Sequence, residues 1–128
     1  MQKGGNMAEI RARQWMFVQD LDHLKVKVDD LSQILENSGC SEWAYILHDK
    51  DLDEEGKLIR PHLHVILKFE NPQTLKKIAE LFKDQPQYVD VWKGRINNAY
   101  SYLIHATNAA QDKHKYSPEE VTASFDFN

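Results

Sequence analysis

The feature that most constrains the fold is an apolar and β-branched run from Leu63 to Phe69, which follows the pair Arg60-Pro61. Turn chemistry followed by such residues is typical of a β-strand. Residues two apart on a strand point to the same face, so His62 and His64 should lie side by side. Neutral imidazole binds first-row divalent metals well, and the pair therefore indicates a metal site. The alternative is two half-exposed histidines near a sheet edge.

The remaining pattern predicts a small α+β fold. We expect strands over Arg11–Asp20, Glu42–His48 and Tyr88–Trp92, an end of the histidine strand at Asn71-Pro72, a last short strand around Phe125 and Phe127, and helices over Leu21–Asn37, Thr74–Asp84 and Gly94–Ala110. Strands separated by crossing helices favour a mainly antiparallel central sheet of about five strands with the helices packed across it.

Length and composition favour one folded domain. The chain has 128 residues, which is enough for one hydrophobic core. Residues 1–10 read as a flexible lead or a cloning remnant, and residues 11–128 as the domain. The single cysteine, Cys40, excludes an internal disulfide and indicates a reducing compartment. No apolar run approaches the roughly 18 residues of a membrane span, and no signal peptide is visible, so we expect a cytoplasmic protein with no membrane partner.

Two further candidate ligands lie beyond the second expected strand. His48 ends that strand, and pairing with the histidine strand would bring it near His62 and His64. Asp51 and Asp49 both follow in an acidic loop, and their spacing alone does not choose between them. Three imidazoles and one carboxylate suit manganese, zinc or, with difficulty, magnesium. The absence of cysteine ligands argues against a structural zinc site.

The last expected helix carries two tyrosines with different surroundings. Its apolar stripe includes Tyr100 and Leu103, so Tyr100 is expected in the core. Tyr102 falls off that stripe and shares a flank with Asn98. An exposed tyrosine hydroxyl acts as a nucleophile once its proton is removed. The alternative for Tyr102 is a half-buried side chain at the domain edge.

Three motifs in order resemble those of the HUH endonucleases, and within them the Rep-type initiators of rolling-circle plasmid replication. They are Leu47-His48-Asp49-Lys50-Asp51, Arg60-Pro61-His62-Leu63-His64-Val65 and Tyr100-Ser101-Tyr102-Leu103-Ile104-His105. The aromatic first strand, Trp15-Met16-Phe17-Val18, also matches. The similarity extends from about Arg13 to His114.

The resemblance implies roles for the residues of these motifs. It implies metal ligation by His62 and His64 with His48 and Asp51, and so favours Asp51 over Asp49. Tyr102 would be the nucleophile and Tyr100 a reserve tyrosine. Apart from the resemblance, His105 lies three residues beyond Tyr102 and is a candidate to orient or deprotonate it, the alternative being a histidine on the helix surface. The ion would be Mn²⁺, with Mg²⁺ as the alternative.

The implied activity is site-specific nicking and strand transfer on single-stranded plasmid origin DNA through a 5′-phosphotyrosine intermediate, which initiates replication. Duplex origin repeats and host replication proteins would be further partners. Relatives carry a C-terminal oligomerisation region, so we expect this chain to be a catalytic and origin-binding domain without it.

Candidate DNA contacts lie just before the tyrosine helix. Trp92, Lys93 and Arg95 combine a stacking aromatic ring with two cations, as single-strand binding requires. Lys50, and Lys113 or Lys115, are candidate phosphate contacts. Trp15 and Trp43 are expected in the core instead. The net charge of −4 argues against a basic coat for duplex DNA but leaves room for a local basic groove.

Three alternatives remain at this point. A mobilisation relaxase or a single-strand transposase would use the same chemistry, although related relaxases place their tyrosine ahead of the histidines. A non-catalytic, metal-stabilised nucleic-acid-binding module would need metal to fold and form no covalent product. A two-histidine-one-carboxylate iron oxygenase fits the ligands, but such sites usually lie in larger barrels.

Overall fold

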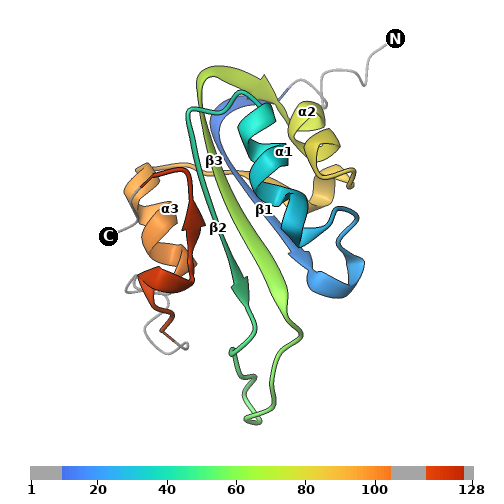
Figure 1. Cartoon of the computed structure of the whole chain (residues 1–128), viewed down its shortest axis with the longest axis vertical. Coiled ribbons are helices and arrows are strands. Elements are labelled where there is room, and N and C mark those ends of the chain that lie inside the picture. Colours follow the sequence, from blue (N-terminus) through green and yellow to red (C-terminus); the bar gives the residue numbers. More distant parts are fainter. Residues whose placement is uncertain (1–9, 105–114, 126–128) are drawn as a thin grey trace.

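The computed structural model describes residues 10–104 and 115–125, which form one antiparallel sheet with helices on both faces (Figure 1). The elements are β1 (Arg11–Asp20), α1 (Leu31–Asn37), β2 (Glu42–His48), β3 (His62–Thr74), α2 (Leu75–Leu81), β4 (Val89–Val91), α3 (Ile96–Leu103) and β5 (Thr122–Ala123). The five strands lie in the order β4-β1-β3-β2-β5. The predicted α+β class with a mainly antiparallel central sheet is therefore confirmed.

One face of the sheet is covered by α1 and α2, and this layer holds the larger hydrophobic core. Alternate residues of β1 and β3 point into it, and Trp15 and Trp43 are both buried there as predicted. Phe17 of β1 stacks on Phe82, which follows α2, with ring centroids 4.0 Å apart and planes 3° from parallel. This contact fixes α2 against the sheet.

The other face is covered by α3 and the C-terminal segment (Figure 1). Ala44 and Ile46 of β2 and Ile66 of β3 pack here against Leu103 of α3. Because side chains alternate along a strand, His48, two residues beyond Ile46, lies on this face as well. The same alternation, counted from Ile66 of β3, places His64 and His62 on the face that α3 covers.

The helix predicted over Leu21–Asn37 is wrong in its first half. Two short 3₁₀ turns, Leu21–His23 and Val28–Asp30, precede α1. Leu24 and Lys27 have extended backbone, with ψ of 129° and 138°. Leu24, Val26 and Val28 still pack on the core. Apolar residues at every second position of this segment face the same side, as residues at helical spacing would. Helical spacing and strand alternation overlap here, and β-branched residues such as Val26 and Val28 have a lower helix propensity.

Smaller differences lie at element ends. β3 continues past Pro72 to Thr74, where its pairing with β1 resumes beyond a register irregularity between Ala12 and Gln14. α3 ends at Leu103, short of the predicted Ala110, and residues 105–110 lie outside the described part. The last strand, β5, pairs Ala123 with Ala44 and comes before Phe125. Phe127 is not among the described residues.

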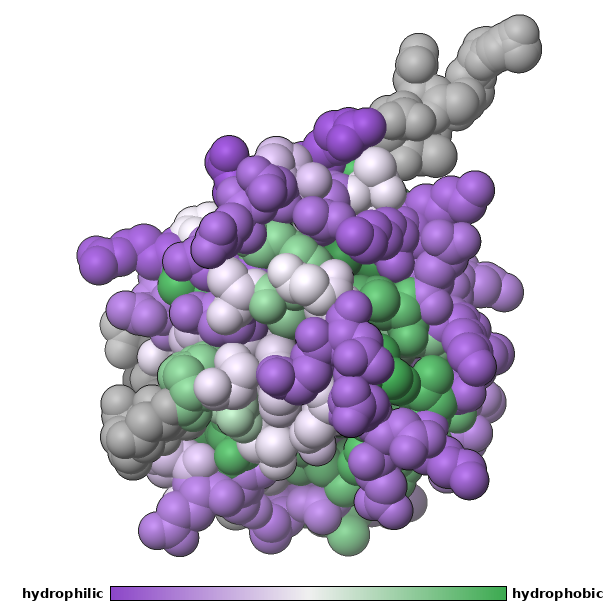
Figure 2. All heavy atoms as spheres, turned by 45° about the horizontal axis from the view of Figure 1, so that its top comes forward, coloured by the Kyte–Doolittle hydropathy of each residue, from purple (hydrophilic) through white to green (hydrophobic). Residues whose placement is uncertain are grey.

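Hydrophilic side chains dominate the face shown in Figure 2, and apolar ones show in scattered patches between them. Within residues 10–104 and 115–125, no helix has the length and apolar character that crossing a membrane requires.

Candidate metal centre and tyrosine helix

The pairing of β2 with β3 brings three histidines together. His48 is the register partner of His62, and Ile46 is that of His64. One ring nitrogen from each of the three histidines lies within 4.8 Å of the others. The His64 ring centroid is 4.2 Å from that of His48 and 4.8 Å from that of His62. The predicted convergence of the three side chains is thus observed, and the cluster could hold a metal ion.

Backbone carbonyls set the orientation of two of these rings. His48 Nε2 donates to the Leu103 carbonyl at 2.6 Å, and His62 Nδ1 donates to the Arg60 carbonyl at 3.0 Å. A carbonyl oxygen only accepts, so these nitrogens carry the hydrogen and a neutral ring keeps its lone pair on the other nitrogen. Histidines that bind metals are held in this way by their second ring nitrogen.

A carboxylate completes the cluster. Asp51 Oδ2 lies 3.8 Å from His48 Nδ1 and 3.8 Å from His62 Nε2, the two ring nitrogens that keep a lone pair. The Asp51 side chain is 10% exposed, whereas that of Asp49 is 45% exposed and contacts Lys50 instead. Three imidazoles and one carboxylate are a donor set that fits a divalent transition metal.

The loop between β2 and β3 holds Asp51 in place. This loop projects from the end of the sheet as a hairpin (Figure 1). The Ile59 amide donates to the Asp51 carbonyl at 2.8 Å, and Leu52 bridges to Leu58 in antiparallel fashion. At the tip, Asp53 Oδ1 accepts from two backbone amides, and Gly56 takes a positive φ of 82°. The acidic loop is therefore an ordered support for the Asp51 carboxylate.

Helix α3 is tied to the histidine cluster through its last turn. Its final residue, Leu103, supplies the carbonyl that accepts from His48, and the next carbonyl, that of Ile104, accepts from the Tyr116 amide at 3.0 Å. Tyr102 is half-buried on this turn. Its ring centroid lies 6.2 Å from that of His64 and 6.3 Å from that of Trp92.

Tyr100 has a different environment, as its place on the apolar stripe predicted. It is 7% exposed, and its hydroxyl donates to Glu42 Oε1 at 2.6 Å. Burial raises the pKa of Tyr100 far above its ordinary value, and the hydrogen bond to Glu42 adds to the rise. A phenolate at this position is strongly disfavoured.

Tyr116 is the residue of this region that the sequence did not indicate. It is buried, its ring stacks on His48 with centroids 4.6 Å apart, and its hydroxyl donates to Asp51 Oδ1 at 3.3 Å. Burial and the Asp51 charge raise the pKa of Tyr116 to about 12, so its hydroxyl stays protonated near neutral pH. No periodic motif surrounds Tyr116, and its contacts with His48 and Asp51 become visible only in the folded chain.

The predicted DNA contacts fall into two groups. Lys50 Nζ lies 2.6 Å from Glu120 Oε1 and 3.5 Å from Asp49 Oδ1, and the Glu120 hydrogen bond raises the pKa of Lys50. Its charge is thus shared with carboxylates. Lys93 and Arg95 are exposed beside the start of α3.

Trp92 is held next to these cations. Its indole nitrogen donates to the Arg95 carbonyl at 3.1 Å, and the Gln14 side chain donates to the carbonyls of Trp92 and Gly94. Lys115 is exposed, while His105 and Lys113 lie outside the described residues.

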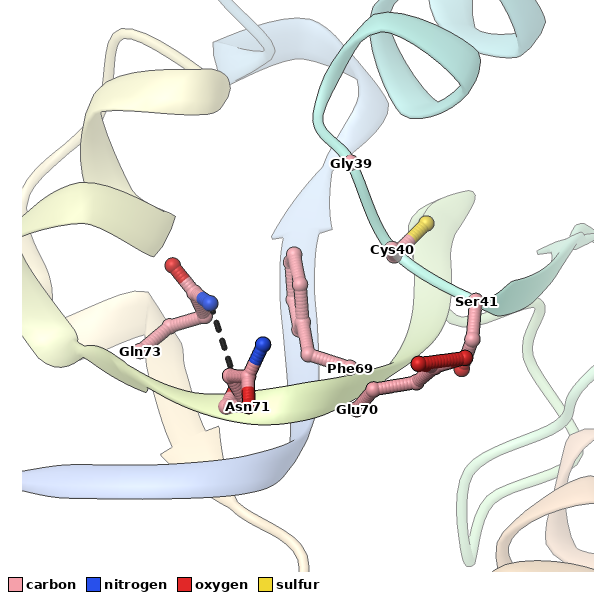
Figure 3. A pocket seen from close by; sticks show the side chains of 7 residues that line it. All are labelled: Gly39, Cys40, Ser41, Phe69, Glu70, Asn71 and Gln73. Carbon is pink, nitrogen blue, oxygen red and sulfur yellow. Dashed lines mark hydrogen bonds between the residues drawn. The ribbon is translucent and has the colours of Figure 1, made fainter.

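A separate pocket of about 320 Å³ lies toward the opposite end of β3 from the histidines (Figure 3). It is lined by Gly39, Cys40, Ser41, Phe69, Glu70, Asn71 and Gln73. This lining contains no cationic side chain, and burial raises the pKa of the Cys40 thiol, which disfavours the thiolate. The pocket offers little to a phosphate or a metal ion.

The fold and the three-histidine cluster together are consistent with the HUH endonuclease class. The profile of the plasmid replication protein origin-binding domain matches residues 7–128. The chain therefore belongs to this family of origin-binding domains.

Two curated relatives are named replication proteins. One, from Onion yellows phytoplasma (strain OY-M), is 33% identical over 114 residues, which cover 80% of this chain and 29% of the relative. The other, from Staphylococcus aureus, is 22% identical over 116 residues, which cover 91% of this chain and 56% of the relative. The chain thus spans under a third of the first relative and somewhat over half of the second.

The cluster predicts a divalent-metal site that stabilises the fold. Mn²⁺ in excess over its dissociation constant should raise the melting temperature, because an ion that binds only the folded state stabilises it. His62→Ala should remove most of that rise, whereas His23→Ala, an exposed histidine outside the cluster, should keep it. Differential scanning fluorimetry with Mn²⁺ or EDTA measures both shifts. Equal rises in the two variants would contradict the assignment.

Proposed function

We propose that this domain nicks single-stranded DNA at a plasmid replication origin, in a metal-dependent reaction with Tyr102 as the nucleophile. The observation that carries the proposal is the hydrogen bond between His48 and the Leu103 carbonyl, which fixes the turn carrying Tyr102 beside the three-histidine cluster. Membership of the origin-binding family supports origin DNA as the target.

In the proposed reaction, the Tyr102 hydroxyl oxygen attacks the phosphorus of one phosphodiester. A bond forms between the tyrosine oxygen and the 5′ phosphate, and the bond from phosphorus to the 3′ oxygen breaks. The phenol proton passes to His105, the base that we propose, and the 3′ oxygen takes up a proton from solvent. The product is a 5′-phosphotyrosyl strand with a free 3′-hydroxyl, from which host replication proteins would extend the leading strand.

Four side chains would hold the metal ion that this chemistry needs: His48, His62, His64 and Asp51. We propose Mn²⁺ as the ion, with Mg²⁺ as the alternative, since imidazole-rich sites suit the softer ion. Once bound, the ion supplies Lewis-acid polarisation of a phosphate oxygen. The preference for Asp51 over Asp49 rests on its low exposure and its approach to His48 and His62, whereas Asp49 contacts Lys50.

Tyr102 suits the nucleophile better than Tyr100 does. Its ring lies near those of His64 and Trp92, with centroids 6.2 Å and 6.3 Å away. Tyr100 instead donates a hydrogen bond to a neighbouring carboxylate, Glu42, and its raised pKa disfavours the phenolate that attack requires. We therefore propose that Tyr100 is a structural residue of the α3 interface, not a second nucleophile.

The DNA strand would approach along the start of α3. Trp92 offers a half-buried aromatic ring beside Tyr102, and the exposed Lys93 and Arg95 offer charge for the phosphates. Lys50 is a weaker candidate, because its amine is shared between Glu120 and Asp49.

The central prediction concerns a covalent protein–DNA adduct. Wild-type protein incubated with single-stranded origin oligonucleotides and Mn²⁺ should give a band that migrates slowly on a denaturing gel. Tyr102→Phe should abolish this band, since it removes the attacking oxygen, and EDTA should do the same. Tyr100→Phe is the matched control from the same helix and should keep the band.

Each other outcome has a distinct meaning. A band lost only in Tyr100→Phe would keep the activity and overturn the choice of nucleophile. Metal-dependent stabilisation without an adduct from any oligonucleotide would favour a non-catalytic nucleic-acid-binding module. An adduct formed with transfer-origin or transposon-end strands but not with replication-origin strands would favour a relaxase or a transposase.

The proposed strand path predicts weaker DNA binding after loss of either cation. In a Tyr102→Phe background, Lys93→Ala or Arg95→Ala should lower affinity for single-stranded DNA. Each change should reduce the slope of log K against log salt by about 0.7, as expected for one lost phosphate contact. Lys76→Ala, an exposed lysine on α2 across the sheet, is the control. Fluorescence anisotropy at several salt concentrations measures the slope, and values equal to the control would contradict the path.

A further inference from the structure

We propose that Tyr116 is a positioning residue that orients both Asp51 and His48 for the metal ion. The inference rests on the proposed function, because it concerns how the same centre is assembled. Tyr116 is 65 residues from Asp51 in sequence and belongs to neither strand of the histidine cluster. Only folding places it there.

The Tyr116 hydroxyl controls which oxygen of Asp51 faces the histidines. Its oxygen accepts from the Lys50 amide at 2.9 Å, so its single hydrogen is directed to Asp51 Oδ1 at 3.3 Å. The other carboxylate oxygen, Oδ2, is then the one that faces His48 and His62. The hydroxyl therefore selects a carboxylate rotamer with one oxygen directed at the cluster.

The Tyr116 ring acts on His48 at the same time. The two rings are stacked at 4.6 Å with planes 24° apart, and His48 Nε2 is bound to the Leu103 carbonyl. One face of the imidazole is therefore covered and one nitrogen is held, which leaves little freedom for ring rotation. Both contacts keep His48 Nδ1 on the side of Asp51.

Tyr116 is itself held by its neighbours. Its amide donates to the Ile104 carbonyl just after α3. Glu120 accepts from the Ser117 amide through Oε2 at 2.8 Å and from Lys50 Nζ through Oε1 at 2.6 Å. The turn after Tyr116 is thus joined to the end of β2, and Lys50 serves that junction. Tyr116 thus links the end of β2 and the loop residue Asp51 to the helix that carries Tyr102.

The test compares Tyr116→Phe, which keeps the ring and removes the hydroxyl, with Tyr45→Phe on the opposite face of β2. Mn²⁺ affinity is measured by isothermal titration calorimetry, and the melting temperature is measured in EDTA. Tyr116→Phe should weaken Mn²⁺ binding by about tenfold, the usual cost of losing a group that orients a metal ligand. Tyr45→Phe should bind Mn²⁺ as wild type does.

A double variant separates positioning from a general effect on stability. In an Asp51→Asn background, Tyr116→Phe should cause no further loss of affinity, because it acts through that carboxylate. Glu120→Gln, which loosens the turn and spares Tyr116, should lower affinity in the same direction by about twofold.

The possible failures are distinct. Unchanged Mn²⁺ affinity in Tyr116→Phe, or a full further loss in the Asp51→Asn background, would overturn the positioning role while the proposed function stands. Absence of Mn²⁺ binding by the wild type would instead overturn the metal centre of the proposed function.

Discussion

The register between β2 and β3 is the constraint on which the rest of the site depends. It sets His48 opposite His62 and leaves His64 on the same face of the sheet. A slip of one residue would turn the histidines of one strand toward α1 and α2, into the larger core. The apolar residues between the histidines and beyond them oppose such a slip, because Leu63 and Val65 would then leave that core. Hydrophobic packing on one face thus fixes the polar cluster on the other.

The tyrosine helix is placed by the same cluster that would bind the metal. α3 packs through Ala99, Tyr100 and Leu103, yet its last turn is fixed by polar contacts: the Leu103 carbonyl on His48 and the Ile104 carbonyl on Tyr116. If Tyr102 is the nucleophile, as we propose, it would need little reorganisation on such a turn to meet a phosphate held at the cluster. Preorganisation of this kind is a large part of what a catalytic site supplies. The ordered hairpin holds Asp51 beside the histidines, as α3 holds Tyr102 near them.

The sequence predicted those features that strand alternation and helical phase encode locally. The histidine pair, the buried Tyr100 and the α+β sheet could all be predicted in this way. The convergence of His62 and His64 with His48 needed one further assumption, that neighbouring strands pair. The choice of Asp51 over Asp49 came from family resemblance, because the sequence spacing of two loop residues does not show which side chain points toward the histidines. Tyr116 could not be predicted, since its partners are far away in sequence. The helix predicted over Leu21–Asn37 was too long, because apolar residues at Leu24, Val26 and Val28 fit both helical spacing and strand alternation.

Crystals of the domain grown with Mn²⁺ and measured at the manganese absorption edge would test the metal centre most directly. If the β2–β3 register builds that centre, anomalous density will show one strong peak bounded by His48, His62, His64 and the inward oxygen of Asp51, on the side of the sheet that faces Tyr102. A peak elsewhere, or no peak at saturating Mn²⁺, would contradict the assignment of the cluster as a metal centre.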